Sequence, residues 1–308
     1  MSKVSAVISA YNEEKNIERC LKSLSFADEI VVVDNSSADD TAKIAKKYTD
    51  KVFSQKNDPK LIDLQKNFGF GKASCEWILS IDADEEISTE LAKEIQTILN
   101  AKPSELASIN GYWIPRKNYM FGKWIKNNTG WYPDYQLRLF KKGKGQYESK
   151  KVHEDLVVEG ETEKLKEHMI HHNYDSIEQF VKKILIYAPN EATAKIENGY
   201  VFSFFDVIRF PLADFLNWFF ARKGYKDGFY GLVLAFMQAF YHFLVFAFIW
   251  EKQGFKEYES QDFLKDTEKE FRKAGREIIF WISKEKLEAI KNPLKRNLQK
   301  ISGKLHKF

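Results

Sequence analysis

The stretch EWILSIDADEEIS, residues 76–88, decides the fold prediction. Its first half is a short apolar run typical of a buried strand, and the run stops at the carboxylates Asp82, Asp84, Glu85 and Glu86. Because residues i and i+2 of an extended segment point to the same side, Asp82 and Asp84 are expected to converge beyond the strand end. Two hard oxygen ligands suit Mg²⁺ or Mn²⁺ held jointly with a phosphate. The alternative is a solvated acidic loop before a helix, whose N-terminus also favours carboxylates.

Strands and helices alternate through the first hundred residues. Apolar, β-branched runs at 4–10 and 29–35 predict buried parallel strands, and a helix between them has apolar residues at helical spacing, with Asn12 as its expected N-cap. Further segments continue the pattern: helix 39–48, strand 51–55, a helix near 60–75, strand 76–82 and a helix near 88–100. This alternation predicts an α/β fold with a parallel, doubly wound sheet, which binds ligands at the carboxyl ends of its strands.

Bulk composition limits the class of protein. The chain has 308 residues, of which 44% are hydrophobic and 30% charged, so we expect about two packed domains. The net charge of +4 does not imply a nucleic-acid partner, and none is expected. Cys20 and Cys75 lack the number and spacing of a disulfide framework or a zinc site. The N-terminal sequence turns polar too early for a signal peptide, which predicts a cytoplasmic first half.

Several motifs follow one another in order along the first half of the chain. YNE follows the first strand at 11–13, VVVDNSSADDT carries Asp34, QKNFG spans 65–69, and IDADE ends a later strand. Over roughly residues 1–175 this ordered set resembles the GT-A glycosyltransferases of family 2. The resemblance implies the GT-A fold, Rossmann-like with a mostly parallel, doubly wound sheet. Further along, PRKNYMFGKWI, GWYPDYQLRLF and VHE are similar to the subgroup that adds sugars to the inner core of bacterial lipopolysaccharide.

The resemblance implies roles for individual residues in binding a nucleotide-sugar donor. Glu13 would lie near the ribose, and Asp34 would accept a hydrogen bond from the base. Asp82 and Asp84 would hold Mg²⁺ or Mn²⁺, which stabilises charge on the departing nucleoside diphosphate. Arg138, like Asp134, would face the acceptor or the diphosphate. The residues expected to bind the donor are Tyr11, Asn12, Glu13, Asp34, Lys66, Asn67, Asp82 and Arg138; for Lys66 and Asn67 a plain helix surface is the alternative.

Inversion at the anomeric carbon requires a base that takes the proton of the acceptor hydroxyl. The resemblance favours Glu154 in KVHEDL, with Asp155 as the second candidate, and a charged strand edge as the alternative for both. A single displacement needs no enzyme nucleophile, and the chain has no G-x-S-x-G motif. In HMIHH, His168, His171 and His172 are close in sequence. The resemblance allows a third metal ligand there, and a strand-edge cluster is the alternative.

The C-terminal half suggests contact with a membrane. Residues 228–250 contain no Asp, Glu, Lys or Arg, and as a helix they would be about 35 Å long. A single crossing would place the basic tail on the far side, against the positive-inside tendency. We therefore expect shallow or re-entrant insertion, with the tail on anionic lipid, and a soluble aromatic bundle as the alternative. The expected basic residues are Lys284, Lys286, Lys291, Lys295, Arg296, Lys300, Lys304 and Lys307.

These expectations combine into one functional hypothesis. Residues 1–190 form a catalytic domain, 191–255 form aromatic membrane-associated helices, and 256–308 form a basic helical tail. The enzyme would be an inverting, metal-dependent glycosyltransferase at the cytoplasmic face of the inner membrane, peripheral or monotopic. By resemblance it would move a hexose, with glucose from UDP-glucose favoured, onto a lipid-linked glycan such as the lipopolysaccharide inner core. The alternatives are a polyprenyl-phosphate glycosyltransferase, a sugar-phosphate nucleotidylyltransferase and a non-enzymatic membrane adaptor.

Overall fold

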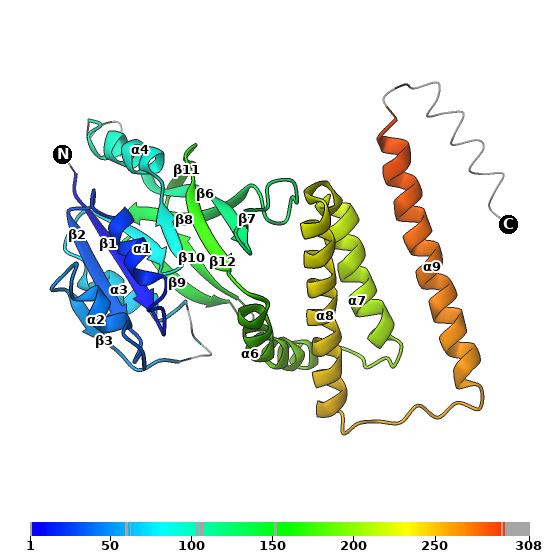
Figure 1. Ribbon diagram of the computed structural model, residues 1–308. Helices are drawn as coiled ribbons and strands as arrows, with labels where there is room; N and C mark the ends of the chain where they lie inside the picture. The colour runs from blue at the N-terminus through cyan, green and yellow to red at the C-terminus, as the bar shows by residue number, and fades with distance from the viewer. Residues whose placement is uncertain are drawn as a thin grey trace. The chain divides into compact units, whose positions relative to one another are not determined.

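The computed structural model divides the chain into two compact units (Figure 1). Unit 1 comprises Met1–Lys126 and Trp131–Asp175, and unit 2 comprises Asn127–Gly130 and Ser176–Phe308. The structure describes residues 2–58, 61, 63–102, 104, 108–150, 153–290 and 292, without the side chains of residues 149, 150, 153 and 154. The boundaries expected at residues 190 and 255 divide the chain by expected function, and they stay predictions.

Unit 1 is built on a large mixed sheet with the strand order β3-β2-β1-β4-β8-β6-β12-β5, in which β11 and β7 also pair with β6. The first four strands run parallel to their neighbours. Strand β8 is antiparallel to both β4 and β6, whereas β12 and β11 run parallel to β6. The predicted α/β class with a mostly parallel sheet is therefore confirmed. The strands of this sheet are β1 (Val4–Ala10), β2 (Glu29–Asp34), β3 (Val52–Ser54), β4 (Trp77–Asp82), β5 (Glu85–Ile87), β6 (Ile109–Met120), β7 (Lys123–Trp124), β8 (Asp134–Lys141), β11 (Glu161–Lys164) and β12 (Met169–Tyr174).

Both faces of the parallel half of the sheet are covered, which is why its strands are apolar throughout. On β1, Val4, Ala6 and Ile8 belong to the core layer that contains residues of α1 and α4, whereas Val7 packs with Phe70 on the opposite side. Alternate residues of a strand point to opposite faces, so a strand buried on both faces shows no polar alternation. The helices of unit 1 are α1 (Ile17–Ser23), α2 (Thr41–Ala45), α3 (Lys66–Lys72) and α4 (Thr89–Leu99).

The sequence prediction differs from the structure at two places in unit 1. Asn12 was expected to cap the first helix, but the N-cap is Asn16, and Asn12 has a φ of 55°. The Asn12 side chain instead accepts a hydrogen bond from the Ala38 amide at 2.8 Å. The segment from 110 to 175, expected to be irregular, contains regular strands of the large sheet and a separate antiparallel pair, β9 (Gly145–Lys150) with β10 (His153–Val158).

Glu29, at the start of β2, is a buried carboxylate that ties three segments of unit 1 together. It accepts hydrogen bonds from the Ser74 amide and hydroxyl, both at 2.7 Å, and it also contacts Ser5 and Lys51. Burial opposes the charge, but the hydrogen bonds from Lys51, Ser5 and Ser74 outweigh it and lower the pKa of Glu29 to about 2. The charged form is therefore the one that stabilises the fold.

We expect Glu29→Gln to lower the free energy of unfolding by about 2–3 kcal/mol at pH 7, because the depressed pKa is linked to stability. A carboxylate with a lowered folded-state pKa contributes fully above its unfolded pKa, near 4.5. Its contribution disappears as the pH falls from about 4.5 toward about 2. Urea unfolding of both proteins between pH 7 and pH 3 measures this difference. A difference that stays constant over that range would contradict the assignment.

Unit 2 is helical. Small residues on α6, Ala188 and Ala192, allow close packing against Val245 and Ile249 of α8, and α7 and α8 lie side by side (Figure 1). The helix predicted near 176–188 is present and continues to Glu197. The elements of unit 2 are α6 (Ile177–Glu197), α7 (Asp206–Leu216), the π-helical turn η1 (Asn217–Ala221), the 3₁₀ turn η2 (Gly224–Asp227), α8 (Phe229–Lys252) and α9 (Phe263–Glu288).

Polar groups also join the helices of unit 2. His242 on α8 contacts Asp214 of α7, and its Nε2 atom is 3.3 Å from Glu191 of α6. Within the described residues, α8 is the one helix long and apolar enough to cross a membrane, and 33% of its most apolar window is buried. Of the predicted basic tail, Lys284 and Lys286 lie on α9. The other six, Lys291, Lys295, Arg296, Lys300, Lys304 and Lys307, lie outside the described residues.

Candidate active site

A cavity of about 460 Å³ in unit 1 lies where β4, β6 and β8 meet the pair β9–β10. Most of its wall is polar, and it includes Asp82, Arg116, Arg138, Tyr147 and Asp155. Asp82 is the last residue of β4, so the strand end delivers its carboxylate to this cavity as the sequence predicted. The cavity therefore brings together residues that are far apart in the chain.

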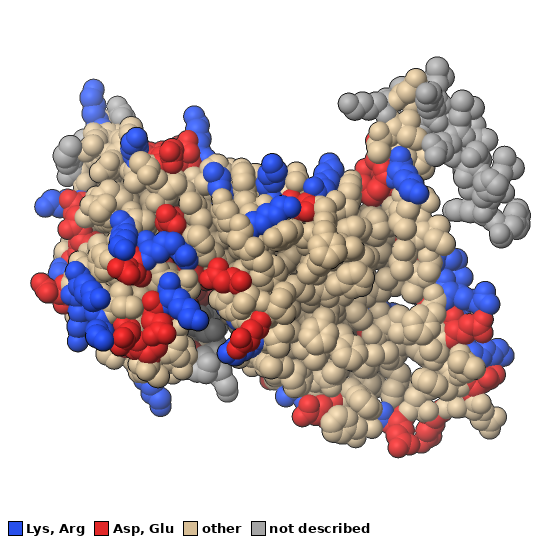
Figure 2. Space-filling model, in the orientation of Figure 1, with Lys and Arg blue, Asp and Glu red and all other residues tan. Residues whose placement is uncertain are grey.

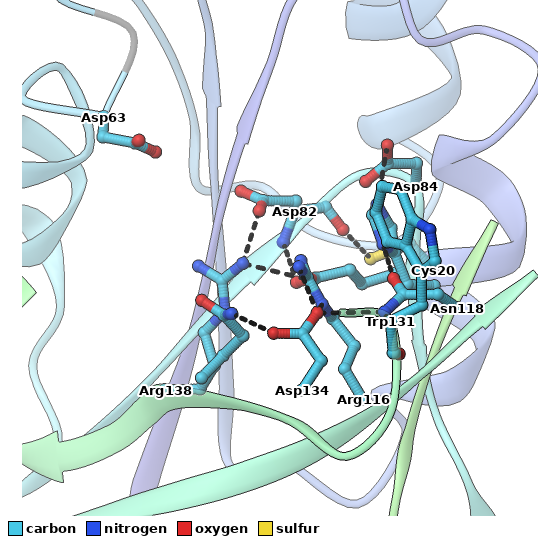
Figure 3. A network of polar contacts seen from close by, with 12 residues as sticks. Cys20, Asp63, Asp82, Asp84, Arg116, Asn118, Trp131, Asp134 and Arg138 are labelled. Atoms are coloured by element: carbon cyan, nitrogen blue, oxygen red, sulfur yellow. Dashed lines mark hydrogen bonds and ion pairs between the residues drawn. The ribbon is translucent and has the colours of Figure 1, made fainter. Parts of the chain in front are cut away.

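The two oxygens of Asp82 are held by two buried cations. Lys66, at the start of α3, is 2.5 Å from Oδ1. The Nη2 atom of Arg138 donates to Oδ2 at 2.6 Å (Figure 3). Burial opposes the charge on Asp82, but Arg138 and Lys66 hold its pKa well below the usual range. Burial likewise opposes the charge on Lys66, and Asp82 nevertheless raises the pKa of Lys66 above its ordinary value. All three groups are therefore charged at neutral pH.

Glu85, at the start of β5, is fully buried and contacts both Asp82 and Arg138. Its Oε1 atom accepts from Arg116 at 3.0 Å and from Arg138 at 2.9 Å, and its Oε2 atom accepts from the Asp82 amide at 2.9 Å. Arg116 also forms two hydrogen bonds to Asp134, at 2.7 and 2.9 Å. The Nε atom of Arg138 is buried and has no hydrogen-bond partner among the described residues. Arg138 thus has one buried N–H group that its contacts to the described residues leave unused.

Asp84 belongs to a second group of side chains beside the first (Figure 3). Its Oδ2 atom is 3.5 Å from Nε2 of His171 on β12. The amide of Asn118 donates to the Trp131 carbonyl and to Asp134, so its oxygen faces Nδ1 of His171 at 2.6 Å. That oxygen accepts a hydrogen bond, which places a proton on Nδ1. The other ring nitrogen, Nε2, faces Asp84.

Four of the residues predicted to bind the donor, Tyr11, Asn12, Glu13 and Asp34, lie at the carboxyl ends of β1 and β2. Asp34 is buried at the end of β2 and accepts from the Ser37 amide at 3.3 Å. The backbone N–H of Asn12 donates to the Ser37 hydroxyl at 2.9 Å, and the backbone N–H of Glu13 donates to the Thr41 hydroxyl at 2.8 Å. Tyr11 is 47% exposed and is therefore open to a ligand. The structure brings these residues to one sheet edge, as the sequence predicted.

The remaining predicted residues take different positions. Asn67 forms two hydrogen bonds to the backbone of Tyr147, at 2.8 and 2.9 Å, so its amide joins α3 to β9. Asp155 is exposed and lines the cavity. The side chain of Glu154 lies outside the described residues. Of the other two histidines, His168 contacts Tyr132 and His172 contacts Glu86, so the three do not converge on one point.

We expect Glu85→Gln to lower the free energy of unfolding by about 3 kcal/mol, because two buried guanidinium groups lose their shared counter-charge. Urea unfolding at pH 7 measures the loss. The matched control is Glu161→Gln on β11, an exposed strand residue, for which a change under about 0.5 kcal/mol is expected. Equal effects of the two substitutions would contradict the supporting role of Glu85.

Comparison with known proteins identifies the family. The sequence model of the protein family described as "Glycosyl transferase family 2" matches residues 5–155. The lipopolysaccharide core biosynthesis glycosyltransferase LpsC of Rhizobium meliloti is 30% identical over 263 residues, which is 82% of this chain and 94% of LpsC. The chain is a family 2 glycosyltransferase. An uncharacterised glycosyltransferase of Rickettsia typhi is 31% identical over 261 residues, which is 79% of this chain and 85% of that protein.

Solved structures of glycosyltransferases also match this family 2 glycosyltransferase. The crystal structure of TarS residues 1–349 from S. aureus with UDP-GlcNAc covers 83% of this chain and 93% of that chain, at 16% identity and a TM-score of 0.44. Glucosyl-3-phosphoglycerate synthase from Mycobacterium tuberculosis covers 38% of this chain and 44% of that chain, at 21% identity and a TM-score of 0.29.

Sequence reasoning assigned no role to several residues of this site. Glu85 was noted only as one of four carboxylates, and Arg116 and Asn118 were not singled out. Strand periodicity could have found them, because Arg116 and Asn118 are i and i+2 on β6 and so share a face. The same spacing relates Asp134, Gln136 and Arg138 on β8, whose side chains face the same polar network.

Proposed function

We propose that this family 2 glycosyltransferase inverts the anomeric centre of a UDP-linked hexose while transferring it to a lipid-linked bacterial glycan, with a divalent cation bound beside Asp84. The observation that carries the proposal is the polar cavity at the end of β4. Asp82 in its wall contacts two buried cations, Lys66 and Arg138, and in the neighbouring group of side chains Asp84 faces the Nε2 atom of His171. Such a site suits a diphosphate, which needs cationic and hydrogen-bonding partners.

The donor set fits a divalent cation. The carboxylate of Asp84 and the Nε2 atom of His171 face each other 3.5 Å apart, and both a carboxylate oxygen and an imidazole nitrogen are ligands that divalent cations accept. Two neighbouring ligands of an octahedral Mg²⁺ are about 3 Å apart, so a small shift would let both bind one ion. The described residues contain no group of three or more His, Cys, Asp or Glu that could hold a metal. The donor's phosphates would therefore complete the coordination, as is common for Mg²⁺.

Asp82 was predicted as a second metal ligand, and that role stays a prediction. Both of its oxygens are engaged by Lys66 and Arg138 in this structure. When bound, the cation would supply Lewis-acid stabilisation of the charge on the departing diphosphate. Arg138 and Lys66 would add fixed positive charge in a buried site, where it acts more strongly than in water. Glu85 would keep Arg138 in position.

Transfer also requires a base, and β10 supplies the candidates. Asp155 lines the cavity that contains Asp82 and Arg138, and Glu154 precedes it in the strand. We propose Glu154 as the base that removes the acceptor proton, with Asp155 as the alternative. The structure places Asp155 in the cavity wall, whereas the preference for Glu154 rests on the family resemblance.

The proposal of a lipid-linked acceptor rests on the name of a relative and on the exposed apolar side chains of unit 2. The name of the R. meliloti relative places that protein in lipopolysaccharide core biosynthesis, and this chain covers 94% of its length. In unit 2, large apolar side chains are exposed along α8 and α9, among them Phe229, Phe236, Phe271 and Ile279. Figure 2 shows a broad surface without charges over part of the helical unit. Exposed apolar surface of this kind marks an interaction site, and we propose the cytoplasmic surface of the inner membrane, bound peripherally with anionic lipid beneath the basic tail.

A panel of nucleotide sugars tests the proposed function. The full chain is incubated with each donor, with Mn²⁺ or Mg²⁺, and with truncated lipopolysaccharide, while released nucleotide and labelled glycan are measured. We expect UDP release and transfer to the glycan, with UDP-glucose the preferred donor. Transfer only to polyprenyl phosphate would support the alternative glycosyltransferase. No metal-dependent nucleotide binding at all would support a membrane adaptor and contradict the proposal.

A further inference from the structure

Unit 2 contains a second cavity, of about 440 Å³, which we call the aromatic pocket. Its wall consists mainly of aromatic rings, including Phe205, Phe246, Trp250, Tyr258 and Phe263. These rings come from the start of α7, from α8, from the connection between α8 and α9, and from the start of α9. All of these elements belong to unit 2, and none belongs to the catalytic cavity.

The polar atoms of the aromatic pocket are already engaged. Trp250 donates from Nε1 to the Lys256 carbonyl at 2.8 Å, and the Tyr258 hydroxyl donates to Asp266 at 3.0 Å. The Thr267 hydroxyl donates to the Phe263 carbonyl at 2.8 Å. Apart from the exposed Lys256 and Glu257, a ligand in the pocket would therefore meet ring faces and apolar groups, because the N–H and O–H groups of Trp250, Tyr258 and Thr267 already donate within the protein.

Edge-to-face contacts between aromatic rings define the shape of the pocket. The Tyr258 ring packs against Phe204, Phe205 and Phe263, with centroid distances of 5.0, 5.4 and 5.7 Å. Trp250 packs edge-to-face against Phe255 at 5.1 Å. Aromatic pairs in this geometry are favourable beyond the area they bury. The connection between α8 and α9 is thus fixed over the pocket by its own rings.

The chemistry of the wall selects the class of ligand. A peptide segment would carry backbone N–H and C=O groups into a site that offers them no partner, at a cost for each unpaired group. Lys256 and Glu257, the charged residues of the wall, are both exposed and opposite in sign, so they do not favour an anion or a cation. A hydrocarbon chain needs no hydrogen bond and gains from leaving water.

The surroundings of the pocket indicate where that chain comes from. Phe243 and Phe263, both in the wall, are 40% and 57% exposed, and the adjacent Phe255 and Leu264 are 56% and 80% exposed. Apolar surface therefore continues from the wall to the outside of the helices. This arrangement matches a site whose ligand enters from the hydrocarbon region of a bilayer.

We propose that the aromatic pocket takes up one acyl chain of a bilayer lipid and so anchors unit 2 to the membrane. The inference rests on the membrane-surface part of the proposed function, but it does not require glycosyl transfer. An extracted chain would hold the helices at the surface without a membrane-spanning segment. Burying a single acyl chain would reinforce a weak surface interaction, because each CH₂ group of the chain gains from leaving water.

Quenching of Trp250 fluorescence by bromine tests the pocket directly. Dibromostearate, used below its aggregation concentration, is titrated into the full chain and into Trp250→Phe, and the difference isolates Trp250 from the other six of the 7 tryptophans. We expect saturable quenching of the Trp250 signal. Quenching that rises linearly without saturation, or that is identical in Trp250→Phe, would overturn the proposal.

Two substitutions fill the pocket from opposite walls. We expect Ala247→Phe on α8 and Thr267→Phe on α9 each to weaken dibromostearate binding at least tenfold, because a phenyl ring takes the place of the chain. The matched control is Ala247→Ser, which keeps the volume and should bind within about twofold of the unsubstituted protein. Circular dichroism and thermal unfolding establish that each variant is folded. Unchanged affinity in both folded phenylalanine variants would overturn the proposal.

A vesicle experiment distinguishes the sources of the chain. Phosphatidylglycerol vesicles with brominated acyl chains should quench Trp250, and the quenching should be lost in Ala247→Phe. If only truncated lipopolysaccharide displaces dibromostearate and vesicles do not, the chain belongs to the acceptor and the assignment to a bilayer lipid is wrong. Transfer to a soluble, delipidated acceptor is measured in parallel. Intact transfer without acyl-chain binding would reject the pocket while leaving the proposed function standing.

Discussion

Replacing Asp84 by asparagine is expected to lower kcat by about 10²–10³-fold, comparable with losing a principal electrostatic contact in the transition state. The substitution keeps the shape of the side chain but removes the negative charge that faces Nε2 of His171. It should also abolish the Mn²⁺-dependent part of UDP binding, measured by calorimetry with and without the metal. The metal-independent part should remain, because Arg138 and Lys66 are unchanged.

The control for Asp84→Asn lies two residues away. Glu86→Gln removes a carboxylate that contacts His172, whereas Asp84 faces His171. We expect its kcat and its UDP affinity to stay within about threefold of the unsubstituted enzyme, since partly exposed pairs of this kind contribute little. If both variants lose metal-dependent binding equally, the role given to Asp84 is wrong.

The second large effect is expected at β10. Glu154→Gln should lower kcat by about 10²–10⁴-fold, the usual contribution of a general base. Donor binding should be retained, because the substitution leaves Asp82, Arg138 and Lys66 unchanged. Pre-steady-state transfer and calorimetric UDP binding, measured on the same preparation, separate chemistry from binding.

Asp155→Asn is the matched control for the base, because it makes the same chemical change at the next residue. We expect it to reduce kcat less than Glu154→Gln does. A large loss of kcat in Asp155→Asn with a small loss in Glu154→Gln would transfer the role to Asp155. Large losses of donor affinity in either variant would mean that the residue binds the donor, contrary to both assignments.

The first half of the fold could be predicted because its signals are local. Strands β1, β2 and β4 are continuous apolar runs, and α1 and α4 show apolar residues at helical spacing. Strands after residue 110 were harder to predict because they are amphipathic and twisted, and register shifts interrupt their pairing. Strand β11, for example, reads ETEK and is exposed throughout, so hydrophobicity could not reveal it.

Some of the residues that the sequence singled out lie together in the structure, and the residues that contact and support them were missed. Asp82 and Arg138 were singled out separately, and the structure joins them by a hydrogen bond of 2.6 Å. What sequence could not show is pairing across the sheet, which brings β5, β6 and β8 together around Glu85. A fully buried carboxylate is rare unless it is paired, but burial is a property of the fold and cannot be read from the letters IDADE.

The most direct measurement is anomalous X-ray scattering from crystals of the full chain soaked with UDP-glucose and Mn²⁺. The account predicts one manganese peak in contact with the Asp84 carboxylate and with the diphosphate of the donor. It also predicts that Arg138 contacts the same diphosphate. A donor bound with no manganese peak at Asp84, or a peak held elsewhere in the cavity with Asp84 turned away, would contradict it.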